Sequence, residues 1–317
     1  YISKMIETYE RLFGEKPKER RSPMDANAHP ELDQTSFCSD EETKIYQSLV
    51  GATQWATSLG RFDISVHVMT MSSFRAQPRK GHLEMIKRFY GYLSRMKDAT
   101  IRYRTDMPDL DDLDIKEYDW SRTVYAGAKE EYPINLPAAR GKPVQQLSYV
   151  DANLYHDMLS GKAVTAILHM LNQTPIDWFS RKQDTVETAT FGSENVAARK
   201  AIEKLRDLKY TLLYLGVPLV DKSVLVGDNK SVVDCATQPH SRLAKRHLML
   251  SYHYVRDAIA TGYYLYAWLN GKDNPSDILS KHWAISNVWG LLQPLLFWHG
   301  DTYNCPKKLT SDSKANG

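Results

Sequence analysis

Residues 223–234 read SVLVGDNKSVVD, a pattern of a strand followed by a helix that indicates the fold class. Residues 224–226 form an apolar run that predicts a buried strand, Gly227 breaks the run, and residues 231–233 begin a helical pattern. A strand that ends at Asp228 places a carboxylate at the carboxyl end of a sheet, where α/β folds bind ligands. Asp228 is therefore a candidate metal ligand, although a single acid at such a place is more simply explained as a cap of the following helix.

Strand and helix patterns alternate on both sides of this stretch. Three strand-like runs come first, and helices and strands then follow in turn. This order predicts an α/β fold with a mixed five-stranded sheet flanked by helices. Strands are expected at residues 147–152, 163–171, 174–180, 223–227 and 263–269, and the longer helices at residues 195–215, 243–260 and 275–281.

The chain before the α/β pattern has a different character. Residues 41–97 carry three amphipathic helical patterns, which predict a small helical bundle, and residues 1–40 form a charged, mostly irregular arm. Strand-like runs occur at 99–104 and 124–128, and the segment 106–119 carries seven acids. We therefore expect four segments: a helical region at 1–104, an acidic linker or insertion at 105–145, an α/β domain at 146–283 and a C-terminal extension at 284–317.

The overall composition is that of an ordinary globular protein. The 317 residues are 42% hydrophobic and 25% charged, with a formal net charge of +3, so a nucleic-acid partner is not demanded by charge alone. The three cysteines, Cys38, Cys235 and Cys305, form no CxxC pair, which favours a reducing, intracellular setting over a disulfide framework or a zinc site. The sequence has no apolar run long enough to cross a bilayer, so no membrane partner is expected. It begins at Tyr1 without a signal-peptide pattern, which suggests a piece of a longer protein.

Four acids fall where predicted strands meet loops or helix starts. Asp151 lies near the end of the first strand, Glu194 at the start of the long helix, Asp228 after the fourth strand and Asp277 at the start of the last helix. If the sheet closes as predicted, these carboxylates converge, and clustered carboxylates repel one another unless a cation neutralises them. Oxygen ligands select Mg²⁺ or Mn²⁺, and two such ions about 4 Å apart can catalyse phosphodiester hydrolysis. Taken singly, each acid has the alternative explanation of a helix cap or a solvated surface charge.

Other acids and bases of the α/β region are weaker candidates. Asp157 and Asp273 are spare acids, and Asp273 is the more credible rival to Asp277. A basic cluster, Arg242, Lys245 and Arg246, is expected at the start of a helix, where it would bind phosphates. In the helical bundle, Lys87 and Arg88 lie on a basic side that could follow a phosphate backbone, and a solvated helix face explains them equally well.

Several stretches together resemble one family. Residues 147–283 resemble the ribonuclease H domain of copia-type long-terminal-repeat retrotransposon Pol polyproteins, and residues upstream resemble the region after the polymerase palm in the same polyproteins. The segments that carry the resemblance are YVDANLYHD (149–157), PIDWFSRKQDTVETATFGSE (175–194), VGDNKSVV (226–233), HSRLAKRHLMLSYHYVRDAI (240–259), NPSDILSKHW (274–283), YQSLVGATQWAT (46–57), RFDIS (61–65) and HLEMIKRFYGYL (82–93).

The resemblance implies a metal-dependent endonuclease, with two Mg²⁺ ions or Mn²⁺, that cuts the RNA strand of an RNA–DNA hybrid. The family's catalytic acids then fall on Asp151, Glu194, Asp228 and Asp277. Residues 1–104 would be the thumb or connection of a reverse transcriptase, and the upstream polymerase domain of the same polyprotein would be a partner. A cytoplasmic setting in a virus-like particle, with a nuclear phase, is also implied.

The chain departs from the family pattern at several places. Asn153 and Leu154 stand where family members often have Asp and Trp, and the surroundings of Glu194 differ from the usual Ser-Thr-Glu-Ala-Glu-Tyr. Residues 270–276 hold no His of the kind that some cellular ribonucleases H carry before the last acid. The polymerase signature Tyr-x-Asp-Asp is absent, so this chain is not expected to polymerise DNA.

Two other functions remain open from the sequence. One is a catalytically inactive module of the same fold that binds hybrids or connects domains in a decayed element. The other is a different nuclease of this fold, such as an integrase or resolvase, which would prefer duplex DNA.

Overall fold

The computed structural model describes residues 1–300, which form two compact units. Of the described residues, the first unit consists of 1–102 and 282–300, and the second of 103–281. Residues 284–300 of the extension expected at 284–317 therefore group with the amino-terminal helices, and residues 301–317 lie outside the described part of the chain. None of the helices in the described part of the chain combines the length and apolar character needed to cross a membrane.

The first unit is helical, as expected for residues 41–97. Two strands of two residues each pair antiparallel and tie the end of the described chain to residue 100, because Thr100 lies opposite Phe297. The strand expected over 99–104 is thus limited to two residues. The elements of this unit are α1 (Ile2–Phe13), η1 (Pro30–Leu32), α2 (Asp40–Ser58), η2 (Phe62–Ile64), α3 (Ser65–Ser72), α4 (Lys80–Arg95), β1 (Thr100–Ile101), α9 (Ile285–Leu292) and β7 (Leu296–Phe297).

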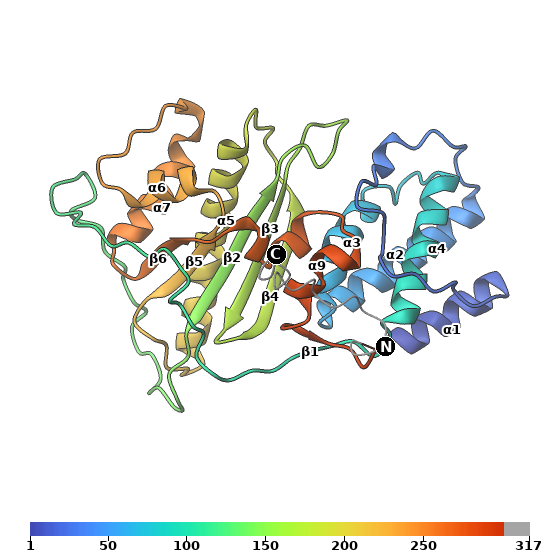
Figure 1. Cartoon of the computed structure of the whole chain (residues 1–317), viewed down its shortest axis with the longest axis horizontal. Helices are drawn as coiled ribbons and strands as arrows, with labels where there is room; N and C mark the ends of the chain where they lie inside the picture. The colour runs from blue at the N-terminus through green and yellow to red at the C-terminus, as the bar shows by residue number, and fades with distance from the viewer. Residues whose placement is uncertain (301–317) are drawn as a thin grey trace, which may run out of the picture. The chain divides into compact units, whose positions relative to one another are not determined.

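The second unit is built on the predicted mixed five-stranded sheet (Figure 1). Its strand order is β4-β3-β2-β5-β6. The neighbours β2, β3 and β4 pair antiparallel, whereas β5 and β6 run parallel to β2. The strands are β2 (Gln146–Asn153), β3 (Val164–Leu171), β4 (Thr174–Lys182), β5 (Ser223–Gly227) and β6 (Tyr264–Trp268).

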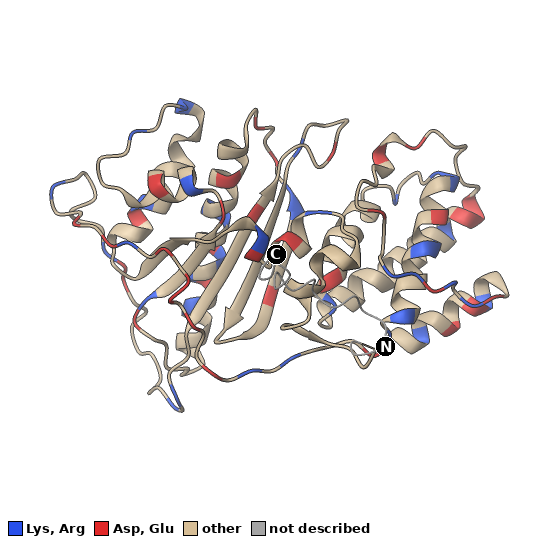
Figure 2. Cartoon of the chain, in the orientation of Figure 1, with Lys and Arg blue, Asp and Glu red and all other residues tan. Residues whose placement is uncertain are grey.

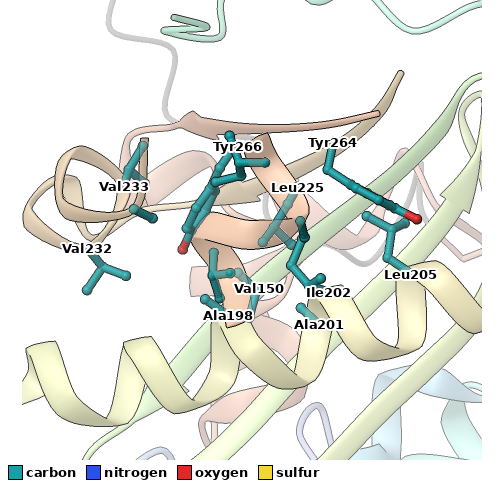
Figure 3. Packing of buried hydrophobic residues seen from close by; sticks show 14 of the residues in the cluster. Val150, Ala198, Ala201, Ile202, Leu205, Leu225, Val232, Val233, Tyr264 and Tyr266 are labelled. Carbon is teal, nitrogen blue, oxygen red and sulfur yellow. The ribbon is translucent and has the colours of Figure 1, made fainter. Parts of the chain in front are cut away.

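The longest helix of this unit packs against the sheet. In Figure 3, Ala198, Ala201, Ile202 and Leu205 of α5 point towards the strands, where they meet Leu225 and neighbouring side chains. All five are fully buried, and burying an Ile or Leu side chain contributes about 1.5–3 kcal/mol to folding. The helices are α5 (Thr190–Tyr214), α6 (Lys230–Thr237), α7 (Met249–Ala260) and α8 (Asp277–Ser280), with short 3₁₀ turns η3 (Arg246–Leu248) and η4 (Gly271–Asp273).

Two helix starts and one expected strand differ most from the sequence predictions. The helix α5 begins at Thr190 rather than at residue 195 and continues through Gly192 and Ser193, so Glu194 lies one turn inside the helix. The helix α7 begins only at Met249, since a 3₁₀ turn precedes it, and the basic cluster therefore lies in a loop. Residues 124–128 form turns rather than a strand, and Val124 is 88% exposed, so its side chain has no sheet to pack against.

The irregular segment 103–145 is held to this unit by buried ionic groups. Glu130 accepts a hydrogen bond from the Tyr264 hydroxyl at 2.5 Å and lies 3.6 Å from the Lys209 ammonium. Arg256, which is 1% exposed, lies over the rings of Trp120 and Tyr125 at 4.7 and 5.3 Å from their centroids. The acidic segment therefore packs against the α/β domain through specific partners and is not a free linker.

Arg256 also forms hydrogen bonds with the backbone at the end of α6 and just after it. We therefore expect its removal to lower the stability of the protein. The guanidinium of Arg256 donates to the carbonyls of Cys235, Gln238 and Pro239 at 2.7–2.8 Å. The substitution Arg256→Met leaves these buried carbonyls without a donor, and we expect it to lower the free energy of unfolding by about 3 kcal/mol. Chemical denaturation followed by circular dichroism measures this.

The matched control is Arg140→Ala, which removes an exposed arginine of the same unit and is expected to change stability by less than about 0.5 kcal/mol. Equal effects of the two substitutions would contradict the role given to Arg256.

Candidate metal centre

Two of the predicted acids are brought together by one strand pairing. The strands β2 and β5 run parallel, and Val150 lies opposite Gly227. Asp151 follows Val150 and Asp228 follows Gly227, so both aspartates lie at the same edge of the sheet. Glu194 joins them from the second turn of α5, which packs against β2. One carboxylate oxygen from each of Asp151, Glu194 and Asp228 lies within 4.8 Å of the other two.

Asp277 reaches the same cluster through a lysine. It is the first residue of α8, and its Oδ1 lies 2.5 Å from the Nζ of Lys281, one helical turn later. The same ammonium lies 3.4 Å from Oδ2 of Asp151. All four acids predicted from the sequence are thus neighbours, although their catalytic role stays a prediction.

The carboxylates are buried among like charges, and their pKa values respond accordingly. Burial raises the pKa of Glu194 well above its usual range, and the charges of Asp151 and Asp228 raise it further. Burial and then the charge of Asp151 also raise the pKa of Asp228. The same two causes, in the same order, raise the pKa of Asp277 to about 7. Without a bound cation, these carboxyl groups therefore bind protons at higher pH than free carboxyl groups do.

Neighbouring polar groups hold the acids in place. The hydroxyl of Ser280 donates to Oδ2 of Asp151. The indole of Trp268 donates to the backbone carbonyl of Asp228 at 2.8 Å, and the amide of Asn274 donates to the carbonyl of Val150 at 2.9 Å. The acids therefore sit on backbone that is fixed from the loop between β6 and α8.

Gly271 explains how that loop can approach so closely. A Cβ atom at this position would lie 3.0 Å from Oδ2 of Asp228, which is closer than van der Waals contact allows without a shift. A glycine therefore leaves the space that the Asp228 carboxylate occupies.

The donor set fits a hard divalent cation. The three grouped ligands are all carboxylates, and Mg²⁺ and Mn²⁺ prefer such oxygen ligands. Asp151 and Glu194 are 2% and 7% exposed, so their charges are poorly screened by water. The ammonium of Lys281 lies 3.4 Å from Oδ2 of Asp151 and neutralises part of the negative charge of the cluster.

The spare acids lie elsewhere. Asp157 pairs with Lys182 at 2.5 Å, and the backbone N–H groups of Leu159 and Ser160 donate to its other oxygen. Asp273 is exposed at the end of η4. Asp277 shares the Lys281 ammonium with Asp151, whereas Asp157 pairs with Lys182, so Asp277 remains the better candidate for a fourth acid.

The predicted phosphate-binding residues differ in their surroundings. The Lys245 ammonium is buried and has no hydrogen-bond partner in the part of the chain that the structure describes. Together with Arg242, Ser231 and Asp234, it lines a pocket between α6 and the following loop. Arg246 is exposed at the start of η3. An unpaired ammonium beside a pocket is what an anion-binding site requires.

Lys87 and Arg88 of the first unit are both paired with acids. Lys87 contacts Glu84 at 2.7 Å, and Arg88 contacts Asp25 at 2.5 Å. Figure 2 shows acidic and basic residues alternating over the helices of this unit, rather than one continuous basic face. Their binding of nucleic acid stays a prediction.

Two features of the second unit were not predicted from the sequence, namely a cleft and the position of Lys281. A cleft of about 320 Å³ beside β4 and α5 is lined by the basic pairs 181–182 and 199–200 and by the acids Asp184 and Glu203. Residues 181–182 end β4 and residues 199–200 lie on α5, so only the fold places the two basic pairs together. Lys281 was also missed, although its position four residues after Asp277 on a helix predicts an ion pair.

The sequence is similar to parts of proteins from transposons. The sequence is 24% identical over 238 residues to the retrovirus-related Pol polyprotein from transposon RE1 of Arabidopsis thaliana, a match that covers 74% of this chain and 14% of that protein. It is 23% identical over 236 residues to the retrovirus-related Pol polyprotein from transposon TNT 1-94 of Nicotiana tabacum, covering 74% and 15%. The chain is a relative of retrovirus-related Pol polyproteins.

The relationship concerns only a part of those polyproteins, since the chain spans 14% of the length of the RE1 protein. No protein-family model matches the sequence. Among solved structures, the N-terminal RNase H domain of a Mycobacterium tuberculosis protein is similar, with 12% identity and a TM-score of 0.35, and the match covers 47% of this chain and 97% of that one.

The raised pKa of Asp277 generates a prediction for the metal-free protein. A carboxyl whose pKa is about 7 when folded and 3.8 otherwise stabilises the fold below about pH 4, and this contribution is lost as the pH rises towards 7. In EDTA, the free energy of unfolding of the wild type should therefore fall between pH 5 and pH 8. Over the same pH range, the free energy of unfolding of Asp277→Asn should fall by about 2 kcal/mol less than that of the wild type, because the variant lacks this carboxyl group.

Urea denaturation of both proteins at the two pH values measures the difference. If the free energy of unfolding had the same pH dependence in both proteins, the pKa of Asp277 would not be raised in the folded state.

Proposed function

We propose that this chain is the ribonuclease H part of a copia-type retrotransposon Pol polyprotein and cleaves the RNA strand of RNA–DNA hybrids. The observation that carries the proposal is the convergence of carboxylate oxygens from Asp151, Glu194 and Asp228 within 4.8 Å at one edge of the sheet. The relationship to Pol polyproteins supports it, because reverse transcription produces hybrids whose RNA must be removed.

The acids would act by holding divalent cations, Mg²⁺ or Mn²⁺. When bound, two such ions lower the pKa of the attacking water and stabilise the departing 3′ oxygen of the phosphodiester. Asp151, Glu194 and Asp228 supply the ligand oxygens, with Asp277 as the fourth acid. Ser280 orients Asp151 by donating to Oδ2, so the other oxygen of that carboxylate is left for the cation. The water oxygen adds to phosphorus as the bond to the 3′ oxygen breaks.

Basic residues of the second unit would hold the hybrid. The unpaired ammonium of Lys245, with Arg242 and Arg246 in the same loop, suits a phosphate of the backbone. The cleft at β4 and α5 offers a second place for a phosphate. Binding would then depend on backbone shape and 2′-hydroxyl groups rather than base edges.

The setting of the enzyme follows from the same proposal. The chain would act beside the upstream polymerase domain of its polyprotein, with Lys87 and Arg88 of the first unit in a thumb or connection that follows the hybrid. Its site of action would be the cytoplasm, in a virus-like particle, with a nuclear phase.

Cleavage of a labelled RNA–DNA hybrid by the full chain with Mg²⁺ tests the activity. We expect Asp151→Asn and Asp228→Asn to reduce cleavage at least about 100-fold, because each removes a charged metal ligand. Asp273→Asn, which changes an exposed acid of the same region, should retain activity. Hybrid binding without cleavage by the wild type would favour the inactive module, and preferential cleavage of duplex DNA would favour an integrase-like or resolvase-like nuclease.

The basic loop is tested by the salt dependence of hybrid binding. Replacing Arg242, Lys245 and Arg246 by Ala should reduce the slope of log K against log salt by about 2 to 3, since each phosphate contact contributes about 1. Fluorescence anisotropy in EDTA measures binding without cleavage. The control replaces the exposed Lys129, Arg140 and Lys142 by Ala, which makes the same change in net charge. An equal loss of slope in both triple variants would assign the effect to net charge instead.

A further inference from the structure

Lys281 is placed as a counter-ion inside the candidate metal centre. Its ammonium lies 2.5 Å from Oδ1 of Asp277 and 3.4 Å from Oδ2 of Asp151. The pairing with Asp277 spans four residues, because Lys281 follows the single turn of α8 that begins at Asp277. One positive charge therefore bridges acids that come from a strand and from a helix.

The charge of Lys281 acts on the whole cluster. It opposes the burial and like-charge effects that raise the pKa values of Glu194, Asp228 and Asp277. Burial without such a partner would leave four carboxylates facing one another. In the metal-free protein, Lys281 thus supplies part of the neutralisation that divalent ions would supply.

The side chain of Lys281 is partly exposed to solvent. Its side chain is 42% exposed, whereas that of Asp151 is 3% exposed. The ammonium therefore approaches the cluster from the solvent side on a flexible four-carbon chain. The acids stay fixed by their neighbours, and only the lysine has to rotate away for another cation to reach Asp151 and Asp277.

We propose that Lys281 is a built-in competitor of the divalent cation, occupying Asp151 and Asp277 until the metal displaces its ammonium. The inference rests on the proposed metal centre and goes beyond it, because it assigns a function to a residue outside the four acids. It follows that the wild-type site binds divalent ions more weakly than its four carboxylates alone would allow. Removing the lysine should strengthen metal binding even though it removes a polar side chain from the site.

Calorimetric titration of Mn²⁺ and of Mg²⁺ into the full chain, stripped of metal and without nucleic acid, tests this. Lys281→Met should bind Mn²⁺ at least about fivefold more tightly than the wild type, the lower end of the usual range for coupled sites. Lys281→Arg, which keeps the charge, should stay near the wild type. The control is Lys272→Met, an exposed lysine of η4 whose loss makes the same change in net charge.

The gain in melting temperature on adding Mn²⁺ provides a second measurement, which serves if Lys281→Met is unstable without metal. A larger gain for Lys281→Met than for Lys272→Met supports the proposal. Equal or weaker metal binding by Lys281→Met, or no metal binding by any variant, overturns it. Because these titrations contain no hybrid, they are independent of cleavage: a chain that binds metal as expected but cuts no hybrid refutes the proposed nuclease and leaves the competition intact.

Discussion

The parallel pairing of β2 with β5 is the constraint on which the rest of the second unit depends. With Val150 opposite Gly227, the next residue of each strand is an aspartate, and both aspartates reach one edge of the sheet. Glu194 of α5 adds a third carboxylate to the same place. Like charges in a poorly solvated position are unfavourable, so this register would be selected against unless the acids had a use.

The remaining structure compensates for this unfavourable cluster. The helix α5 packs small side chains, Ala197, Ala198 and Ala201, against the sheet, and all three are fully buried. Small residues let a helix approach a sheet closely, which brings Glu194 within reach of Asp151 and Asp228. The hydrophobic core gained in this way offsets the repulsion among the acids. Binding of a divalent cation would stabilise the fold further, because the cation binds the folded site and not the unfolded chain.

Buried cationic side chains also attach the irregular segment 103–145 to the α/β domain. Arg256 and Lys209 both lie on helices, and both contact aromatic rings and acceptors of distant segments. The segment 103–145 has few backbone partners of its own, so side chains such as Glu130 attach it to the sheet and α5. Lys281 also contacts acids of two separate segments, but it is partly exposed and its partners are candidate metal ligands.

Local sequence patterns correctly predicted the mixed five-stranded sheet and the helices of residues 41–97, and they singled out four acids whose role as a set stays a prediction. Strand and helix periodicity are local properties, and acids that recur at four boundaries between strands, loops and helices indicate a shared role. The helix starts were less predictable: the α5 boundary moved from 195 to Thr190 and the α7 boundary from 243 to Met249, because caps and 3₁₀ turns depend on neighbours.

Which residues meet depends on the three-dimensional arrangement of the chain. Residues 282–300 group with the amino-terminal helices, and Lys281 lies between Asp151 and Asp277. The fold also brings the basic pairs at 181–182 and 199–200 to one cleft. These outcomes depend on strand register and helix packing between segments far apart in the chain, and distances of that kind leave no trace in local sequence patterns.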